Sequence, residues 1–247
     1  MDFALKSDVG KVRKLNEDYC GYYFQEGGAI SVFILADGMG GHNAGEVASK
    51  AAVESILAYA AGFIERSGAA INEKEIAEFC SEAITKANTD VINLSSRSYE
   101  MRGMGTTVVM AALWENGACI SHAGDSRAYF ITNGSIKQLT EDHSYVEELI
   151  KAGTITREEA KNHPQKNLIT SAIGADKTIE MDTSIINMSG SDAIILCSDG
   201  LTNLVEEDEI LDIFLKGAYA NEICDALLKE ANSRGGHDNI TAIVIRN

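Results

Sequence analysis

Two short runs of the sequence are apolar at every position, and this pattern constrains the fold more than any other feature. The runs are VFILA (32–36) and AIILC (193–197). A strand with one face in water alternates apolar and polar residues, whereas a strand buried on both faces reads as a continuous apolar run. We therefore expect both segments to be strands that other layers of the protein cover on their two faces.

The remaining apolar patterns fall into antiparallel groups of strands, with helices inserted in pairs. Asn-Gly pairs at 116–117 and 133–134 are the strongest short hairpin signal. Apolar residues at helical spacing predict helices over 44–65, 73–95 and about 221–233. Strands are expected at 3–10, 19–25, 30–37, 105–114, 117–125, 127–134, 135–140, 181–188, 193–200 and 239–246. This order predicts an α+β fold in which helices cover antiparallel sheets.

The charge balance limits the partners of the chain. Its 247 residues include 37 acidic and 21 basic side chains, which give a net charge of −16. Such a surface repels the phosphate backbone, so nucleic acid is not an expected partner. A phosphorylated substrate would meet the same field, and its binding would require metal ions or a well-placed arginine.

The N-terminal sequence does not resemble a secretion signal. It is polar, and no apolar run in the chain approaches the roughly 20 residues of a membrane span. Five cysteines occur without a C-x-x-C pair, at Cys20, Cys80, Cys119, Cys197 and Cys224. We expect reduced, buried thiols in a cytoplasmic protein that does not insert stably into a membrane.

Acidic residues recur where apolar strands start or stop. They are Glu17, Asp18, Asp37, Asp125, Asp199 and Asp238, usually beside Gly or Ser. Any single Asp-Gly after a strand is most simply a turn, but converging strand ends would bring all these carboxylates into one small volume. Like charges at such distances do not all stay ionised without compensation. Mg²⁺ or Mn²⁺ would provide it, because both prefer oxygen ligands, whereas the sequence lacks the H-x-x-x-H or C-x-x-C spacing typical of zinc.

Eight ordered blocks of the sequence resemble those of one family. They are RKLNEDY, ILADGMGGHNAGEVAS, GMGTTVV, GDSRAY, TEDHSYVEELIKAG, HPQKNLITSAIG, ILCSDGLT and GGHDNITAIV, and they span nearly the whole chain. The sequence is similar to the metal-dependent PPM, or protein phosphatase 2C, family of Ser/Thr phosphatases, and most to its compact bacterial members. The resemblance implies a four-layer α-β-β-α sandwich of two mainly antiparallel sheets flanked by helices. It also implies a single domain over 1–247, with a mobile flap at about 141–177.

The resemblance assigns two core metal ions to four residues. In the family, the Asp of ADG bridges both ions and the following Gly gives its carbonyl to one of them, which implies Asp37 and Gly38. The Asp residues of SDG and DN complete the shell of one ion, which implies Asp199 and Asp238.

Further site positions follow from the same resemblance. One of Glu17 and Asp18 supports the second metal, directly or through water, and which of them is the direct ligand stays open. Asp125, in GDSR, helps to hold a third, weaker metal in bacterial members. Arg13 matches the arginine that binds the substrate phosphate, a task suited to the guanidinium fork.

The implied reaction is hydrolysis of phosphoserine or phosphothreonine in proteins by a water that metal ions activate, in reversal of a bacterial Ser/Thr kinase. Asp37 and Arg13 are the expected catalytic residues. Some eukaryotic members carry a general-acid histidine two residues after the bridging Asp, but this position is Met39 here. We expect His42 to order the glycine loop instead.

Three other features are expected to be structural. The glycine-rich stretch 103–107 lacks the Lys of a P-loop and should let a strand start close to the metal site. His122 is expected to be a packed strand histidine, and Asp192 a turn residue. Relatives often carry arginine at the positions of Lys166 and Ser171. With fewer positive charges, the flap is expected to differ in its choice of substrate, whereas the reaction stays the same.

Other classes of function stay open at the level of sequence. A catalytically silent or narrowly specific regulatory member would keep the same fold, although all the expected metal carboxylates are present. A Ca²⁺-binding module is less well supported, because no D-x-[DN]-x-[DN]-G loop occurs. A dedicated target, such as a stress regulator, is a further alternative. The expected partners are phosphorylated proteins and a cognate Ser/Thr kinase, and a monomer is the expected state.

Overall fold

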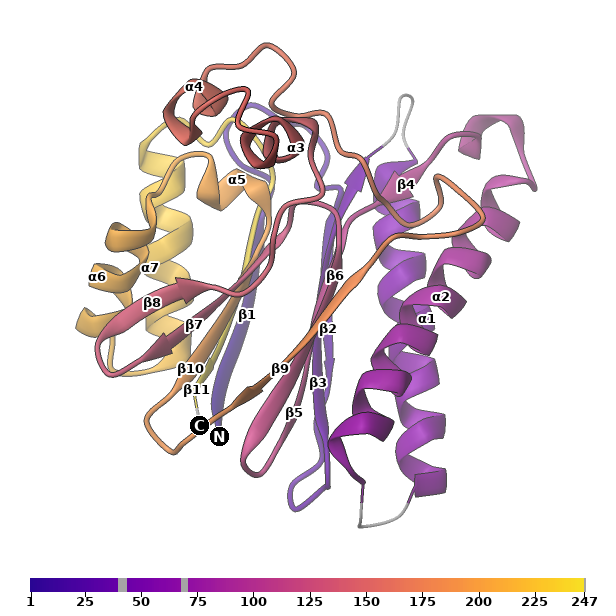
Figure 1. Cartoon of the computed structure of the whole chain (residues 1–247), viewed down its shortest axis with the longest axis vertical. Helices are drawn as coiled ribbons and strands as arrows, with labels where there is room; N and C mark the ends of the chain where they lie inside the picture. The colour runs from indigo at the N-terminus through magenta and orange to yellow at the C-terminus, as the bar shows by residue number, and fades with distance from the viewer. Residues whose placement is uncertain (40–43, 68–70, 247) are drawn as a thin grey trace.

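Two antiparallel sheets lie face to face in the computed structural model, which describes residues 1–39, 44–67 and 71–246 (Figure 1). In spatial order, the first sheet contains β1 (Asp2–Asp8), β11 (Ile240–Arg246), β10 (Ala193–Cys197), β7 (Arg127–Thr132) and β8 (Ser135–Gln138). The second contains β2 (Asp18–Tyr23), β3 (Ser31–Met39), β5 (Val108–Trp114), β6 (Gly117–Ala123) and β9 (Asp182–Asn187), and β4 (Gly105–Thr106) pairs with β3.

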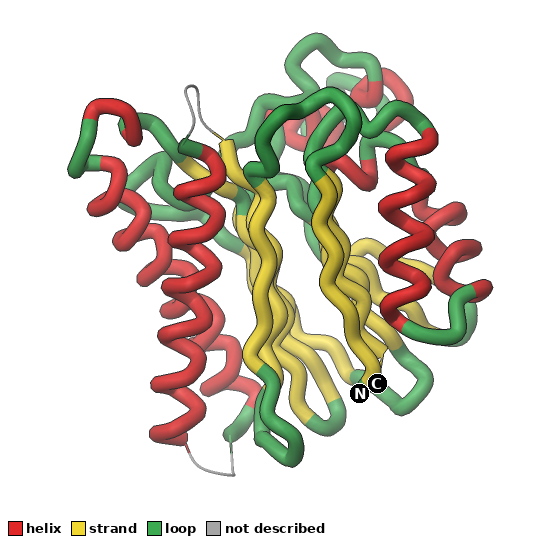
Figure 2. Tube along the Cα trace, turned by 180° about the vertical axis from the view of Figure 1, so that it is seen from behind, coloured by secondary structure: helices red, strands yellow, loops and turns green. Residues whose placement is uncertain are grey.

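Two pairs of helices cover the outer faces of the sheets. Helices α1 (Gly45–Ser67) and α2 (Glu73–Ser95) pack on the second sheet, and α6 (Glu207–Lys216) and α7 (Ala220–Ser233) pack on the first. The view from behind shows the same four layers (Figure 2). The expected α-β-β-α sandwich is therefore confirmed, as are the three helices expected from periodicity.

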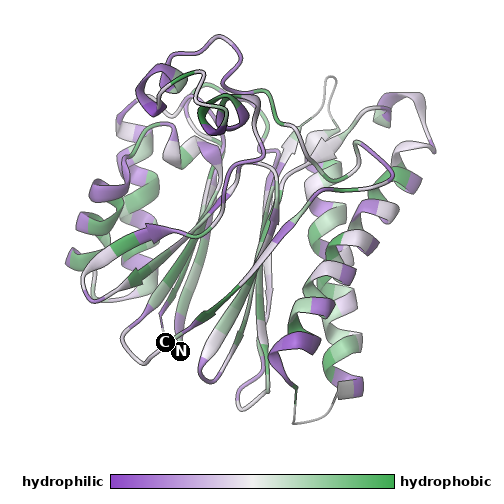
Figure 3. Ribbon diagram, in the orientation of Figure 1, coloured by the Kyte–Doolittle hydropathy of each residue, from purple (hydrophilic) through white to green (hydrophobic). Residues whose placement is uncertain are grey.

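Helix α6 was not anticipated from the sequence. Its start is marked by a capping box between Glu206 and Glu209, and its buried residues Ile210 and Phe214 have helical spacing. The remaining helices are short: η1 (Tyr99–Met101), α3 (Tyr145–Lys151), α4 (Arg157–Lys161) and α5 (Asp199–Thr202). They lie in connections that are largely hydrophilic, whereas the sheets are largely hydrophobic (Figure 3).

The two continuous apolar runs, residues 32–36 and 193–197, are buried on both faces, as expected. Within β3, Val32 and Ile34 belong to the core beneath α1 and α2, whereas Phe33 and Leu35 belong to the core between the sheets. Strand β10 alternates in the same way between the core under α7 and the core between the sheets. Because both faces are packed, these strands can hold their ends in fixed positions.

The two expected hairpins form, with different turn chemistry. Asn133 and Gly134 join β7 to β8 with φ of 49° and 72°, the positive values that a tight hairpin turn requires. The β5–β6 loop is residues 115–116, between the strand ends expected at 114 and 117, and Gly117 pairs with Trp114. A Cβ on Gly117 would lie 2.4 Å from the Trp114 ring, so this glycine makes room for the indole.

Helix α1 is, among the described residues, long and apolar enough by length and composition to cross a membrane. This differs from the expectation that no run approaches that length. A core helix passes the same test, and the stripe formed by Ala48, Ala52 and Ile56 is fully buried in the core over the second sheet. All five cysteines are free thiols, and burial raises the pKa of Cys197 and Cys224 to about 12.

We predict that Leu35→Ala lowers the free energy of unfolding by about 2–5 kcal/mol, because it opens a cavity between the two sheets. Leu215→Ala is the matched control, since Leu215 is 57% exposed and its truncation should cost less than about 0.5 kcal/mol. Urea denaturation of both variants measures the difference. Equal losses would show that the core between the sheets does not dominate stability.

Candidate metal centre

The acidic residues singled out in the sequence meet at one end of the two sheets. Asp18 and Asp37 are directly opposed on β2 and β3, and Asp199 begins α5 just after β10. Asp125 follows β6, and Asp238 precedes β11 by two residues. The negative charges of the other four act together on the Asp37 carboxylate. The structure thus gathers five carboxylates from segments far apart in the sequence.

Burial and mutual repulsion disfavour the ionised forms of these carboxylates. Burial is the largest cause that raises the pKa of Asp37 well above its usual range. The charges of its acidic neighbours raise this pKa further. Burial raises the pKa of Asp18 to about 7 and the pKa of Asp125 to about 8, and the charge of Asp199 adds to both shifts. The pKa of Asp199 is raised by burial and by Asp238. One pKa unit corresponds to about 1.4 kcal/mol, so ionising this cluster is costly unless cations accompany it.

The two carboxylate oxygens of Asp18 have different surroundings. Asp18 Oδ2 accepts a hydrogen bond from Ser198 Oγ at 2.8 Å. Asp18 Oδ1 is buried without a hydrogen-bond partner among the described residues. Buried polar atoms are nearly always satisfied, and an unpaired buried charge is strongly disfavoured. A cation bound by oxygen ligands fits this group of donors, and Mg²⁺ and Mn²⁺ prefer such ligands.

Arg13 brings positive charge to the edge of the cluster. Its NH2 group donates to Asp238 Oδ2 at 2.9 Å, and its NH1 group lies 3.7 Å from Glu17 Oε2. Burial raises the pKa of Glu17, while Arg13 opposes the shift. The Arg13 side chain remains 47% exposed, so its guanidinium is accessible to a ligand.

The glycines of the two Asp-Gly pairs are required by close backbone contacts. A Cβ on Gly38 would lie 2.2 Å from the carbonyl oxygen of Gly45, and a Cβ on Gly200 would lie 1.9 Å from that of Asn239. Neighbouring chain segments therefore pack so tightly around the carboxylates that neither position has room for a Cβ.

Strand β3 does not end at Asp37, as the sequence suggested, but continues to Met39. Gly38 and Met39 pair with β4, which belongs to the glycine-rich stretch 103–107. Thr107 fixes Asp37 from the adjoining segment: its N–H donates to Asp37 O at 2.9 Å, and its hydroxyl accepts from Asp37 N–H at 3.0 Å. The expectation that this stretch starts a strand beside the acidic cluster is confirmed.

Two polar residues that hold the site together were missed in the sequence. Asn239 Nδ2 donates to the carbonyl oxygens of Val9 and Leu15, both at 3.0 Å, and its Oδ1 accepts from Glu17 N–H at 2.8 Å. Ser198 bonds Asp18 and also accepts from the N–H of Thr241 at 3.0 Å. Both residues adjoin a predicted ligand, in SDG and DN, and this adjacency was the available signal.

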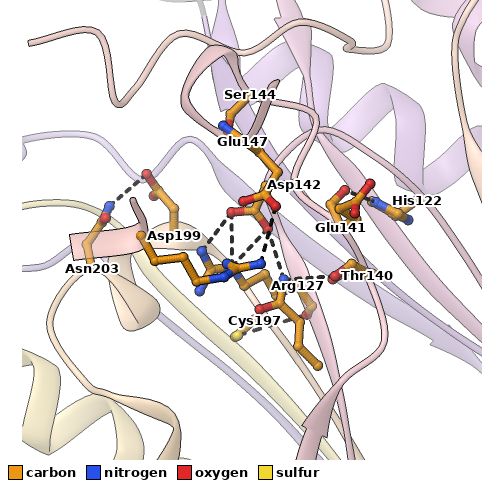
Figure 4. Close-up of polar contacts among 12 residues, drawn as sticks. His122, Arg127, Thr140, Glu141, Asp142, Ser144, Glu147, Cys197, Asp199 and Asn203 are labelled. Atoms are coloured by element: carbon orange, nitrogen blue, oxygen red, sulfur yellow. Dashed lines mark hydrogen bonds and ion pairs between the residues drawn. The ribbon is translucent and has the colours of Figure 1, made fainter. Parts of the chain in front are cut away.

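The segment expected to form a flap begins at a bidentate ion pair (Figure 4). Arg127 Nε donates to Asp142 Oδ1 at 2.9 Å and its NH2 group donates to Oδ2 at 2.7 Å. This pairing raises the pKa of Arg127 against the effect of its burial. In the same view, Asn203 donates to Asp199 Oδ2 at 2.9 Å. Neither interaction was anticipated from the sequence.

The far end of the same segment is fixed to α2. Asn88, which is 1% exposed, donates to the carbonyl oxygen of Asp176 at 2.9 Å and accepts from Gly174 N–H at 2.7 Å. Between these ends, Lys166 lines a cavity of about 430 Å³ that Asp125 and Asp199 also line. Ser171 is buried and donates to the carbonyl oxygen of Glu180. Of the two flap residues Lys166 and Ser171, only Lys166 adds a positive charge beside the carboxylates.

The other residues weighed in the sequence take structural positions. His122 is buried on β6, with Nε2 2.8 Å from the carbonyl oxygen of Glu141 (Figure 4). Asp192 accepts from the N–H and the hydroxyl of Ser189 in a turn. His42 lies outside the described residues.

Comparison with known sequences shows to which family the chain belongs. The sequence model of protein phosphatase 2C matches residues 11–233. The chain belongs to the protein phosphatase 2C, or PPM, family. It is 38% identical over 245 residues to the serine/threonine phosphatase stp of Listeria monocytogenes serotype 4b, with 99% of this chain and 95% of the relative covered.

Solved structures of the PPM family have the same fold. The serine/threonine phosphatase Stp1 from Staphylococcus aureus superposes with a TM-score of 0.91 at 35% identity, covering 100% of this chain and 95% of that chain. The catalytic domain of the phosphatase PstP, solved in complex with two manganese ions, superposes with a TM-score of 0.83 at 31% identity, covering 99% and 96%.

We predict that, in EDTA, this PPM chain loses stability as the pH rises from 6.5 to 8.5. Over this range the unfolded carboxylates are already ionised, whereas Asp18 and Asp125, with pKa values of about 7 and 8, lose protons only in the folded state. The folded state therefore binds more protons, and its stability falls with pH, by about 1–3 kcal/mol.

Thermal unfolding at several pH values measures this effect. Asp125→Asn removes one of the repelling charges and should make the decline shallower, and Mn²⁺ should offset it. A melting temperature independent of pH in EDTA would contradict the repulsion derived for this cluster.

Proposed function

We propose that the chain is a metal-dependent protein-serine/threonine phosphatase, which hydrolyses phosphoserine and phosphothreonine in proteins. Membership of the PPM family and relatives named as serine/threonine phosphatases support this activity. The single observation that carries it in this chain is the convergence of five buried or half-buried carboxylates, one of which has an unpaired buried oxygen. The sequence carries every carboxylate that the resemblance implies for an active member, which supports an active enzyme over a silent one.

We assign the core metal sites to the residues expected from the resemblance. Asp37, the carbonyl oxygen of Gly38, Asp199 and Asp238 would together hold the two core ions. The convergence of these carboxylates supports the assignment. The unpaired oxygen of Asp18 supports a direct role for this residue.

Glu17 and Asp125 are assigned supporting roles. The Glu17 carboxylate lies beside the guanidinium of Arg13, which supports a role for Glu17 through water. Asp125 lies with Asp199 on the cavity side and would hold a third, weaker ion.

The divalent ions supply, when bound, an activated water nucleophile and positive charge against the phosphate. Arg13 would bind the phosphate oxygens through its planar fork, which suits bidentate recognition. Its contact with Asp238 orients the guanidinium toward the same end of the sheets. Positioning and charge are what this reaction demands of a protein, because phosphoryl transfer needs little covalent chemistry.

The finer features of the proposal rest on the family and on composition. Manganese or magnesium is the proposed metal, and the manganese in the PstP structure supports the former. The proposed substrates are phosphorylated proteins, with a cognate bacterial Ser/Thr kinase as the opposing enzyme. A single flap-bearing domain that acts as a monomer in the cytoplasm is the simplest arrangement. The acidic net charge of −16 supports the expectation that nucleic acid is not a partner.

We predict that the wild-type protein releases phosphate from a phosphothreonine peptide in the presence of Mn²⁺ and not in the presence of EDTA. Asp199→Asn with Mn²⁺ should lower kcat/KM by more than about a hundredfold, since even partners outside the first shell change metal sites about 10–100-fold. Asp212→Asn, on the exposed side of α6, is the matched control and should stay near wild type. Negligible release by folded wild-type protein under all conditions would refute the activity.

We further predict that Arg13→Lys raises KM for the phosphopeptide by about tenfold, because an ammonium does not reproduce the two parallel hydrogen bonds of a guanidinium. Calorimetry should show nearly unchanged Mn²⁺ binding. The control is Arg102→Lys, an arginine whose guanidinium lies over the Tyr99 ring. A KM equal to that of wild type would remove Arg13 from phosphate binding.

A further inference from the structure

His143 makes two hydrogen bonds to the turn that carries Asp125. Its backbone N–H donates to Gly124 O at 3.0 Å, and its side-chain Nδ1 lies 3.3 Å from Gly124 N–H, from which it accepts. The turn has little freedom, because Gly124 has φ of 107° and a Cβ there would lie 2.6 Å from the Thr107 side chain. The place of Asp125 therefore depends on the place of the His143 ring.

The hydrogen bonds also define the protonation of this ring. Nδ1 accepts from Gly124, so it carries no proton, and the proton of the neutral imidazole is on Nε2. Nε2 lies 3.2 Å from Asp182 Oδ2, at the start of β9. The His143 side chain is 10% exposed and that of Asp182 is 61% exposed. A carboxylate at Nε2 selects both the tautomer and the ring orientation.

His122 holds the other side of the ring. The two imidazoles stack with centroids 4.7 Å apart and an angle of 19° between their planes. The His122 ring is itself fixed, because its Nε2 donates to the carbonyl oxygen of Glu141 (Figure 4). His143 is thus fixed by three neighbours: Gly124, Asp182 and His122.

The same side chains offer an alternative use as metal ligands. Ligand atoms of His122, His143 and Asp182 all lie within 4.8 Å of one another. However, both ring nitrogens of His143 and Nε2 of His122 already have hydrogen-bond partners. These contacts indicate that the side chains form a network that positions Gly124. They argue against a separate metal site at the same residues.

We propose that His143 is a positioning residue for Asp125, which it places through the unprotonated Nδ1, and that Asp182 selects the tautomer this requires. The inference rests on the proposed role of Asp125 in holding a third, weaker metal ion. Partners outside the first shell orient metal ligands, and their removal weakens metal binding about 10–100-fold.

The first test compares Mn²⁺ binding isotherms, with Asp125→Asn defining the part of the binding that depends on Asp125. His143→Ala should weaken that part by about tenfold or more. His143→Asn should largely restore it, because the Asn side-chain oxygen can accept from Gly124 N–H near the place of Nδ1. His163→Ala, a flap histidine that does not line the cavity, is the matched control. Equal loss in His143→Asn and His143→Ala, or no change in Asp125→Asn, would overturn the proposal.

The second test reads the tautomer directly from the imidazole ¹⁵N resonances of His143 in the full-length protein. The expected spectrum shows an unprotonated Nδ1 and a protonated Nε2. Asp182→Ala should mix the tautomers, whereas Asp182→Asn, which keeps an acceptor, should preserve them. A protonated Nδ1, or a His143 resonance that shifts on direct binding of added Zn²⁺, would overturn the proposal. Phosphate release by wild-type protein tests the proposed function separately, since neither the isotherms nor the spectra depend on turnover.

Discussion

Repulsion between carboxylates is the constraint on which the rest of this structure depends. Asp37 lies where the charges of Asp18, Asp125, Asp199 and Asp238 all act on it. Side chains free to move would separate, because each approach raises the energy of the ionised forms. Here they are fixed by strands packed on both faces, such as β3. The two sheets thus act as a rigid frame that holds like charges together, in an arrangement that suits divalent cations.

The frame is completed by contacts between segments distant in sequence. Asn239, near the C-terminal end, holds the loop from Val9 to Glu17 near the N-terminal end through three hydrogen bonds. Gly38 and Gly200 admit neighbouring backbone where any side chain would collide. The site therefore depends on backbone packing as much as on its acidic side chains, which explains why the Asp-Gly pairs recur.

The sequence predicted the features that depend on local pattern. The continuous apolar runs predicted doubly covered strands, and the recurring carboxylates at strand ends predicted an acidic cluster. Features that depend on proximity in three dimensions were missed, such as the bond between Ser198 and Asp18, which are 180 positions apart. Helix α6 had the necessary signals in its capping box and its buried Ile210, but its many charged residues obscured them. Strand β3 continued beyond Asp37 because β4 was there to pair with it.

The anchoring of the flap segment limits the effect of sequence change within it. Its first end is held by the ion pair between Arg127 and Asp142, and its last end by the contacts of Asn88. Between these anchors, most of the segment, including Lys166, is exposed. Insertions and substitutions at the exposed positions of the segment, after His143, would be absorbed without displacing the carboxylates. Sequence change in this segment would therefore reshape the rim of the cavity that Lys166 lines, while β3 and β10 hold the carboxylates in place.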